Sequence, residues 1–273
     1  MRRIVGNWSG RAGAVLVALV VVFALFAPLL ATHDPEALDV MNRFGSPTAG
    51  HWLGTDQVGR DIYSRLVFGT RVAIGVALAA IALAAAPGVL LGMAAAVLGG
   101  WWDRTLLVLF DVVAAFPSLI LALAIVAVFG PSTRNLVLIV ALTLTPQFGR
   151  VARAQALAVK AAPFLDAERI LGAARARIVL RHLLPNIAGP LIVLASLDIP
   201  NVITIEAGLS FIGLGVRPPL ASWGTLINDG YAYLSDSVWP VLTASMALAI
   251  ATLGFTLFGE ALRDALDPRN RAR

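Results

Sequence analysis

The chain contains no cysteine and only one lysine, three tyrosines and three histidines among its 273 residues. The absence of cysteine excludes disulfides, thiolate metal sites, iron–sulfur clusters and cysteine nucleophiles. Charge is also scarce, because Asp, Glu, Lys and Arg make up 14% of the chain, against 59% for hydrophobic residues, and the mean hydropathy is +0.84. So little charge cannot cover the surface of a soluble protein of this length. The composition therefore predicts an all-α, polytopic membrane protein.

Basic residues outnumber acidic ones, 21 to 16, and the isoelectric point is about 10.6. A nucleic-acid groove would need a stripe of basic side chains interleaved with aromatic ones, and no such stripe is present. The basic residues lie mostly at the ends of apolar runs, which is typical of membrane boundaries. The charge balance therefore predicts an orientation in a membrane and no nucleic-acid partner.

Intervals without formal charge predict where the chain crosses the membrane, because one helix needs about 20 apolar residues. A helix is expected at 135–151, and another at 182–216 together with a re-entrant or surface segment that begins near Gly208. Four further intervals are each predicted to hold one helix, which makes six in total: Arg11 to Asp34, Arg71 to Asp103, Asp111 to Arg134, and Asp236 to Glu260.

The first apolar run follows several arginines, as in a signal peptide, but no A-x-A-like cleavage site comes after it. It is therefore predicted to remain as an uncleaved helix. Six spans place both termini on one side. With the termini inside, 15 of the 21 Lys and Arg residues are cytoplasmic, which fits the positive-inside rule. The other six are expected outside: Arg43, Arg60, Arg65, Arg71, Arg134 and Arg217.

The predicted organisation has four parts. Residues 1–31 form an N-terminal cytoplasmic tail and the first helix, and residues 32–70 form an extracytoplasmic segment. Residues 71–260 form a five-helix core that includes a cytoplasmic loop at 154–186. Residues 261–273 form a C-terminal cytoplasmic tail. None of the pieces outside the membrane is long enough to be a soluble domain.

The cytoplasmic loop contains the sequence A-P-F-L-D-A-E-R-I-L-G at 162–172, which has helix signals at both ends. Proline is tolerated in a first turn, acidic residues suit the positive N-terminal end, and glycine can close a helix. One face of this helix is predicted to be apolar, and a second helical pattern from Arg175 is expected to end at Pro185-Asn186. The apolar face comprises Phe164, Ala167 and Leu171.

Such an amphipathic helix suits two roles. It can lie on the membrane surface, or it can dock in a groove of a cytoplasmic partner.

The spacing of residues in this loop resembles a known signature. Asp166-Ala167-Glu168 is followed after three residues by Gly172, after nine more by His182, and then by Leu184-Pro185. This pattern is similar to EAA-x3-G-x9-I-x-LP in the permease subunits of ABC importers.

Motifs elsewhere in the chain resemble the C-type permease of the peptide/nickel branch, so that the likeness spans 28–269. They are G-T-D-Q-V-G-R-D at 54–61, D-V-V-A-A-F-P-S-L at 111–119, R-H-L-L-P-N at 181–186, E-A-G-L-S-F-I-G-L-G-V-R-P-P at 206–219, W-G at 223–224 and L-R-D-A-L-D-P-R at 262–269.

The resemblance implies a type I ABC importer permease fold with a cytoplasmic coupling helix, in the inner membrane. It implies a heterodimer with a second, homologous permease subunit, two ATPase subunits or a fused ATPase, and an extracytoplasmic substrate-binding protein. The partner ATPases would bind ATP and magnesium. The chain itself is expected to hold no cofactor, no metal and no catalytic residue. Its only lysine, Lys160, follows Val159, so the phosphate-binding GK[ST] motif is absent.

The resemblance also implies which residues couple the permease to the ATPases: Phe164, Asp166, Ala167, Glu168, Gly172, His182, Leu184 and Pro185. Two departures from the signature stand out. Asp166 keeps the charge of the first glutamate, whereas Glu168 places a bulky charge where alanine would pack, and so either alters affinity for the partner or points to water. His182 replaces isoleucine, although R-H-x-L-P is a common form in this branch.

Charged groups inside a membrane are costly and need an explanation. Asp198 and Glu206 lie eight residues apart and therefore within about 80° of each other on an ideal helix. Both are expected to face protein or water, where they either line the transport path or serve a structural pairing.

Outside the spans, His33 and His51 have no fixed metal-ligand spacing, so they are interpreted as solvated surface residues. Segments 54–61 and 213–223 are candidate docking surfaces for a binding protein. Gly88-x3-Gly92 predicts close helix packing.

These observations predict a permease subunit that forms half of a transmembrane path for di- or oligopeptides and couples it to ATPases. The same machinery for nickel or another small solute remains open. An autonomous secondary transporter or channel is a further alternative, but it leaves the cytoplasmic loop without a use. A membrane-embedded hydrolase has little support, because HExxH and GxSxG motifs are both absent.

Overall fold

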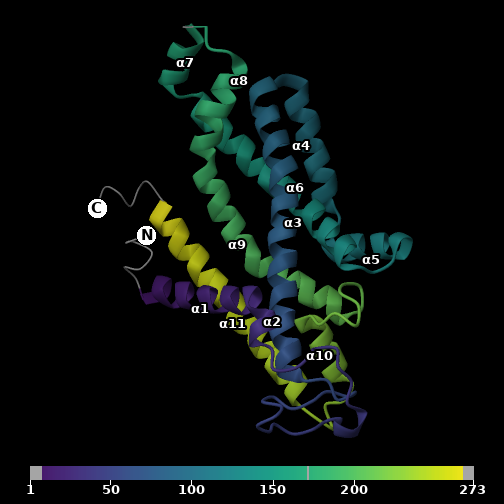
Figure 1. Ribbon diagram of the computed structural model, residues 1–273. Helices are drawn as coiled ribbons and strands as arrows, with labels where there is room; N and C mark the ends of the chain where they lie inside the picture. The colour runs from purple at the N-terminus through teal and green to yellow at the C-terminus, as the bar shows by residue number, and fades with distance from the viewer. Residues whose placement is uncertain (1–7, 171, 267–273) are drawn as a thin grey trace.

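The computed structural model describes residues 8–170 and 172–266, and this part of the chain is helical and holds no β-sheet (Figure 1). The all-α prediction is confirmed. The longer helices are α1 (Trp8–Leu25), α3 (Ile62–Leu98), α4 (Gly100–Ala115), α5 (Ser118–Phe129), α6 (Thr133–Lys160), α9 (Leu184–Phe211) and α11 (Trp239–Leu266). The shorter elements are α2 (Ala27–Leu30), the 3₁₀ turn η2 (Val40–Asn42), α7 (Pro163–Ile170), α8 (Arg175–Arg177), the π-helical segment η3 (Ile178–Leu183) and α10 (Trp223–Tyr231).

Five helical runs in the described residues are long and apolar enough to cross a membrane: α1, α3, α6, the run 178–211 and α11. A sixth crossing is obtained when α4 and α5, which meet at 84°, are counted as one bent span. The prediction of one helix between Asp111 and Arg134 is wrong. Pro117 forces the preceding residue, Phe116, into an extended conformation (φ −83°, ψ 123°), so the helix breaks there.

Two other helix limits differ from the sequence-based ones. The second helical pattern does not end at Pro185, because α8, η3 and α9 follow one another without a break from Arg175 to Phe211. Pro185 is the second residue of α9, which directly follows the π-helical segment η3, so a proline does not end the helical run here. Helix α3 begins at Ile62, inside the segment predicted as 32–70, because the side chain of Asp61 accepts a hydrogen bond from the Ser64 N–H and caps the helix.

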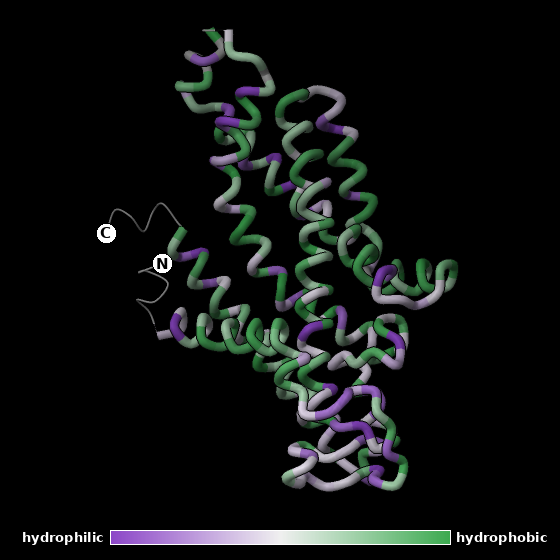
Figure 2. The backbone as a smooth tube through the Cα atoms, in the orientation of Figure 1, coloured by the Kyte–Doolittle hydropathy of each residue, from purple (hydrophilic) through white to green (hydrophobic). Residues whose placement is uncertain are grey.

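Helix α3 stands at the centre of the molecule. It packs most extensively on α6 and also contacts α1, α9 and α10, while α1 crosses α11 (Figure 1). The tube in Figure 2 is mostly green along these helices and mostly white and purple at the end that holds residues 32–61 and α10. We call this the α10 end, and we call the opposite end, with α7, α8 and the turn between α3 and α4, the α7 end.

The contact between α3 and α6 depends on small residues. A Cβ atom on Gly88 would lie 2.7 Å from the Thr145 carbonyl oxygen, and one on Gly92 would lie 2.1 Å from the Gly149 carbonyl oxygen. Both distances are shorter than real Cβ contacts, so only glycine permits this approach. The predicted close packing at Gly88-x3-Gly92 is therefore confirmed.

We predict that Gly92→Val lowers the stability of the purified protein by at least about 2 kcal/mol, because the side chain must push α6 away. Gly75→Val is the matched control, since Gly75 lies in the same helix and a Cβ there meets nothing within 4 Å. Thermal unfolding in detergent should show a lower midpoint for Gly92→Val than for Gly75→Val. Equal midpoints would contradict the packing account.

Candidate functional site

Among the described side chains of helix α7, Leu165 makes the buried apolar contact with the rest of the molecule. Leu165 is fully buried and packs with Ile178 and Leu183 of η3 in a small core of its own. Other apolar residues of α7 remain outside this core: Phe164 is 47% exposed and Ile170 is 86% exposed. The helix is therefore seated on one face and presents an apolar surface on the other.

The predicted apolar face is only partly described. Phe164 lies at its exposed edge, whereas the side chain of Ala167 and all of Leu171 lie outside the described residues, as does the side chain of Asp166. The sequence analysis did not single out Leu165, the residue that fixes the helix. Leu165 lies about 100° around the helix from Phe164 and therefore falls outside the predicted apolar face.

Glu168 and His182, two of the residues that depart from the EAA signature, contact each other. An oxygen of Glu168 lies 3.5 Å from Nε2 of His182, and the ring of His182 is also tilted against Phe164, with centroids 5.9 Å apart. Glu168 therefore faces η3. The change from alanine to glutamate in the triplet is matched by the change from isoleucine to histidine ten residues after Gly172.

Gly172 ends the short helix by a left-handed turn. Its φ is +81°, and the N–H of Ala173 donates to the carbonyl of Glu168, which is the 6→1 hydrogen bond of a Schellman motif. This confirms that a glycine closes the helix at this point. Leu184 and Pro185 follow η3 with exposed side chains at the start of α9.

Asp198 and Glu206 are both buried on α9, as expected from their cost in a membrane. Ser210 donates a hydrogen bond of 2.8 Å to Oε1 of Glu206, and the same hydroxyl accepts from the Val216 N–H. One oxygen of each carboxyl group, Oδ2 of Asp198 and Oε2 of Glu206, has no hydrogen-bond partner among the described residues. The two groups therefore do not form a pair with each other.

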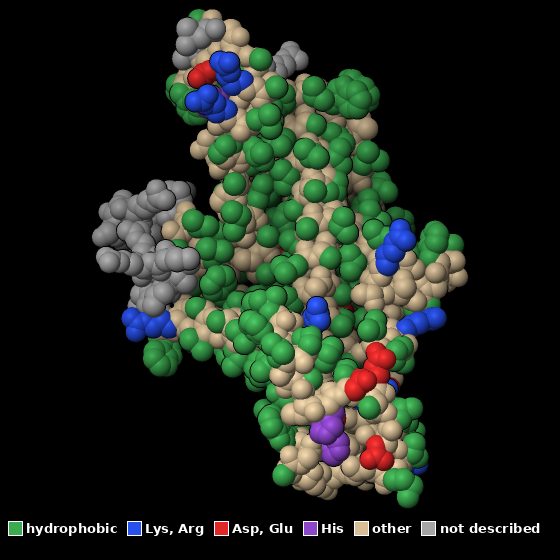
Figure 3. Space-filling model, in the orientation of Figure 1, with side chains coloured by type: hydrophobic (Ala, Val, Ile, Leu, Met, Phe, Trp, Pro, Cys, Tyr) green, Lys and Arg blue, Asp and Glu red, His purple; other side chains and the backbone are tan. Residues whose placement is uncertain are grey.

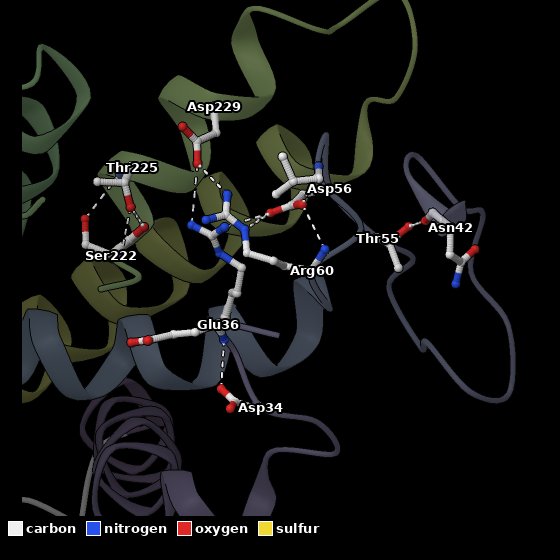
Figure 4. Close-up of polar contacts among 11 residues, drawn as sticks. Asp34, Glu36, Asn42, Thr55, Asp56, Arg60, Ser222, Thr225 and Asp229 are labelled. Atoms are coloured by element: carbon white, nitrogen blue, oxygen red, sulfur yellow. Dashed lines mark hydrogen bonds and ion pairs between the residues drawn. The ribbon is translucent and has the colours of Figure 1, made fainter. Parts of the chain in front are cut away.

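A buried cluster of charges joins the start of α3 to α10 (Figure 4). Oδ2 of Asp56 lies 2.7 Å from both Nε of Arg60 and Nη1 of Arg65, and the two arginines also reach Asp229 on α10 at 3.3 and 3.4 Å. Arg65 is only 2% exposed. Nearby, Nε1 of Trp223 donates to the Leu66 carbonyl. The cluster holds α10 against α3.

This arrangement limits the candidate docking surfaces. Most of segment 54–61 is buried, and only Gln57 and Val58 are partly exposed. Its charges serve the cluster, so the segment is a structural link and presents little surface. In segment 213–223, residues 217–220 are exposed whereas 221–223 are buried.

This chain is similar to known proteins along most of its length. Residues 88–272 match the family described as "Binding-protein-dependent transport system inner membrane component". The chain belongs to this family. Residues 1–47 also match the N-terminal transmembrane domain of oligopeptide transport permease C. The protein is therefore a multi-pass permease component of an ABC importer in the inner membrane, as the signature indicated.

Several relatives resemble this permease along almost its whole length. The Escherichia coli protein named "Probable D,D-dipeptide transport system permease protein DdpC" is 41% identical over 94% of this chain and 86% of its own. The dipeptide transport system permease protein DppC of Alkalihalophilus pseudofirmus is 36% identical over 95% and 86%. The nickel transport system permease protein NikC of Escherichia coli is 37% identical over 96% and 95%.

A solved structure agrees with the fold. The inward-facing MetNI methionine ABC transporter matches with a TM-score of 0.62 and 17% identity, over 76% of this permease and 98% of the matched chain. At this identity the likeness concerns the fold alone, and it confirms the predicted type I importer architecture.

We predict that the contact between Glu168 and His182 contributes to stability as a pair. His182→Ile or Glu168→Ala alone should each lower the stability of the permease, whereas the double variant, which restores the residues of the signature, should lose less than the sum. The expected coupling energy is about 0.5–1 kcal/mol for a partly exposed pair. A double-mutant cycle by thermal unfolding measures it, and strict additivity would show that the two side chains do not interact.

We predict a larger effect at the buried cluster. Asp56→Asn leaves Arg60 and Arg65 to share Asp229 and should cost about 3 kcal/mol. Asp34→Asn, the same change at an exposed position, is the control and should cost less than about 0.5 kcal/mol. Thermal unfolding in detergent compares them. If Asp56→Asn unfolded like wild type, the cluster would not hold α10 in place.

Proposed function

We propose that this permease forms half of the transmembrane path of an ATP-driven importer for di- or oligopeptides. The path is completed by a second, homologous permease subunit, and ATP is hydrolysed by cytoplasmic ATPase subunits or a fused ATPase. The observation that carries the proposal is the combination of a seated, outward-facing α7 with relatives named for dipeptide transport. A substrate-binding protein delivers the peptide at the α10 end, where residues 217–220 offer the exposed surface.

Helix α7 is well suited to transmit movement. Leu165 fixes it to η3, and η3 continues directly into α9, which carries Asp198 and Glu206. A displacement of α7 by an ATPase would therefore move the spanning helix with it as a rigid body. Phe164 and Ile170, which are exposed, supply the apolar contact with the ATPase groove.

The coupling role extends to the other residues of the signature. Asp166 supplies charge and Ala167 a small side chain for recognition of the partner, and Glu168 with His182 fixes the angle between α7 and η3. Gly172 provides the turn, and Leu184 with Pro185 start the spanning helix. Asp198 and Glu206 act at the path or at the interface between the two permease subunits, since each buries an oxygen that lacks a partner among the described residues.

The proposal places the α7 end in the cytoplasm. The basic residues of the connection between α6 and α9 lie there, as do Arg104 and Lys160, and the positive-inside rule favours the cytoplasm for them. Both termini are then cytoplasmic and the α10 end faces outward. Reporter fusions after residues 160 and 273 should report the inside and a fusion after residue 45 the outside. An external signal at 160 would overturn this topology.

Transport of nickel by the same machinery is the second candidate, because NikC resembles this permease as closely as several peptide permeases do. The two candidates are separated by isolating the permease from its native membranes in mild detergent and identifying the accompanying subunits by mass spectrometry. The reconstituted complex is then tested with a labelled dipeptide and with Ni²⁺. Dipeptide uptake that depends on ATP supports the proposal. Uptake of Ni²⁺ alone, or isolation of the permease without ATPase subunits, contradicts it.

We predict that Gly172→Val uncouples ATP hydrolysis from uptake. A β-branched residue at φ +81° is disfavoured by about 1–2 kcal/mol, so the turn that positions α7 is lost. Uptake should fall about tenfold or more while membrane insertion is retained. Gly172→Asn is the matched control, because asparagine tolerates this conformation and should keep most of the activity.

Charge reversal at Asp166 by Asp166→Lys should have the same uncoupling effect, because it opposes an arginine or lysine on the partner. Uptake and ATPase rates are measured on the same proteoliposomes. If uptake were unchanged in both Gly172→Val and Asp166→Lys, α7 would not be the coupling element.

A further inference from the structure

Two histidines and an aspartate that are far apart in the sequence meet at the α10 end. His33 follows α2, His51 lies in the loop after η2, and Asp61 precedes α3. Nδ1 of His51 lies 2.9 Å from Oδ1 of Asp61, and Nδ1 of His33 lies 3.9 Å from Oδ2 of the same carboxyl group. Figure 3 shows two histidine side chains in contact at this end, and the rings stack with centroids 4.5 Å apart. The sequence spacing gave no indication of this arrangement.

The distances between the ligand atoms of these three residues allow a metal ion to bind after small side-chain rotations. A tetrahedral ion with bonds of about 2.0–2.1 Å holds neighbouring ligand atoms about 3.3 Å apart. The measured separations of 2.9 and 3.9 Å lie on either side of this value, and one ligand atom from each residue lies within 4.8 Å of the others. An ion can therefore be held by the three residues without a change in the backbone.

The orientation of the Asp61 carboxylate is fixed without a metal ion. Its carboxylate is buried and accepts a hydrogen bond of 2.8 Å from the Ser64 N–H, which holds its orientation. A carboxylate has about four lone-pair positions, so this cap and a metal bond can coexist.

The histidines provide both selectivity and access. Their side chains are 41% and 21% exposed, against 1% for Asp61, so an ion can enter from solvent on the imidazole side. Imidazole nitrogen favours Zn²⁺, Cu²⁺ and Ni²⁺, whereas Mg²⁺ and Ca²⁺ prefer oxygen ligands. Three protein ligands leave a fourth position for water or another small ligand.

We infer that His33, His51 and Asp61 form a binding site for a divalent transition-metal ion at the α10 end. On binding, the ion takes the place of the hydrogen bond between His51 and Asp61, and the imidazole proton is held on Nε2 so that Nδ1 can bind the metal. The bound ion connects His33 and His51 of the loop to Asp61, the residue that caps α3, and so stabilises this end of the permease. The inference is independent of which solute the permease carries.

The test uses the full-length permease, purified with its accompanying subunits through an affinity tag without histidine. The protein is dialysed against buffered Zn²⁺, and bound zinc is counted by elemental mass spectrometry. Wild type should bind zinc saturably, in the presence of excess Mg²⁺, with one more ion per permease than the double variant His33→Gln/His51→Gln binds. Asp61→Asn, which preserves the helix cap because asparagine also caps, should weaken binding by about tenfold to a hundredfold or more.

Matched controls separate this site from general attraction of cations. His182→Gln alters the third histidine of the chain and Asp34→Asn a neighbouring exposed acid, and both should bind zinc as wild type does. Zinc should also raise the thermal midpoint of wild type and leave that of the double variant unchanged. The inference is overturned if wild type shows no saturable zinc binding, or if His33→Gln/His51→Gln binds the ion as tightly as wild type.

Discussion

The close approach of α3 to α6 is the constraint on which the other contacts depend. In a bilayer, lipid tails are as apolar as leucine, so helices associate through close packing and polar contacts. Gly88 and Gly92 remove side chains from α3 where the backbone of α6 passes, and no larger residue fits there. With α6 fixed in this way, α3 has its remaining faces free for α1, α9 and α10. The long helix thereby connects the α7 end to the α10 end as one rigid element.

At the α10 end, ion pairs hold α3 against its neighbours, as close backbone packing does at Gly88 and Gly92. Arg65 is buried in the first turns of the helix and is acceptable there only because Asp56 and Asp229 reach it from two other segments. Asp56 is in turn held by the backbone, since it also accepts hydrogen bonds from the N–H groups of Val58 and Arg60. Asp56, Arg60 and Arg65 therefore act inside the protein, and residues 217–220 are the exposed surface available to another protein.

At the α7 end, a short helix is kept in place by few contacts. Leu165 enters a small core separate from the main one, and Glu168 meets His182 across the turn made by Gly172. Because Leu165 and Glu168 tie α7 to η3, the two elements can move as a unit, and η3 continues into the spanning helix α9. An attachment on one side and an exposed apolar surface on the other suit the proposed coupling to a soluble ATPase.

The sequence by itself determined the class of the protein, the approximate positions of the spans and the family, because apolar length and motif spacing are local properties of the chain. It also located the glycine that closes α7, since a left-handed turn selects its residue directly. Only the tertiary structure decided which side chains meet. The pairing of Glu168 with His182 and the meeting of His33, His51 and Asp61 join residues whose separations in sequence follow no period. Such contacts depend on how the loops fold back against the helices. A pattern of residues along the sequence does not contain these distances in space.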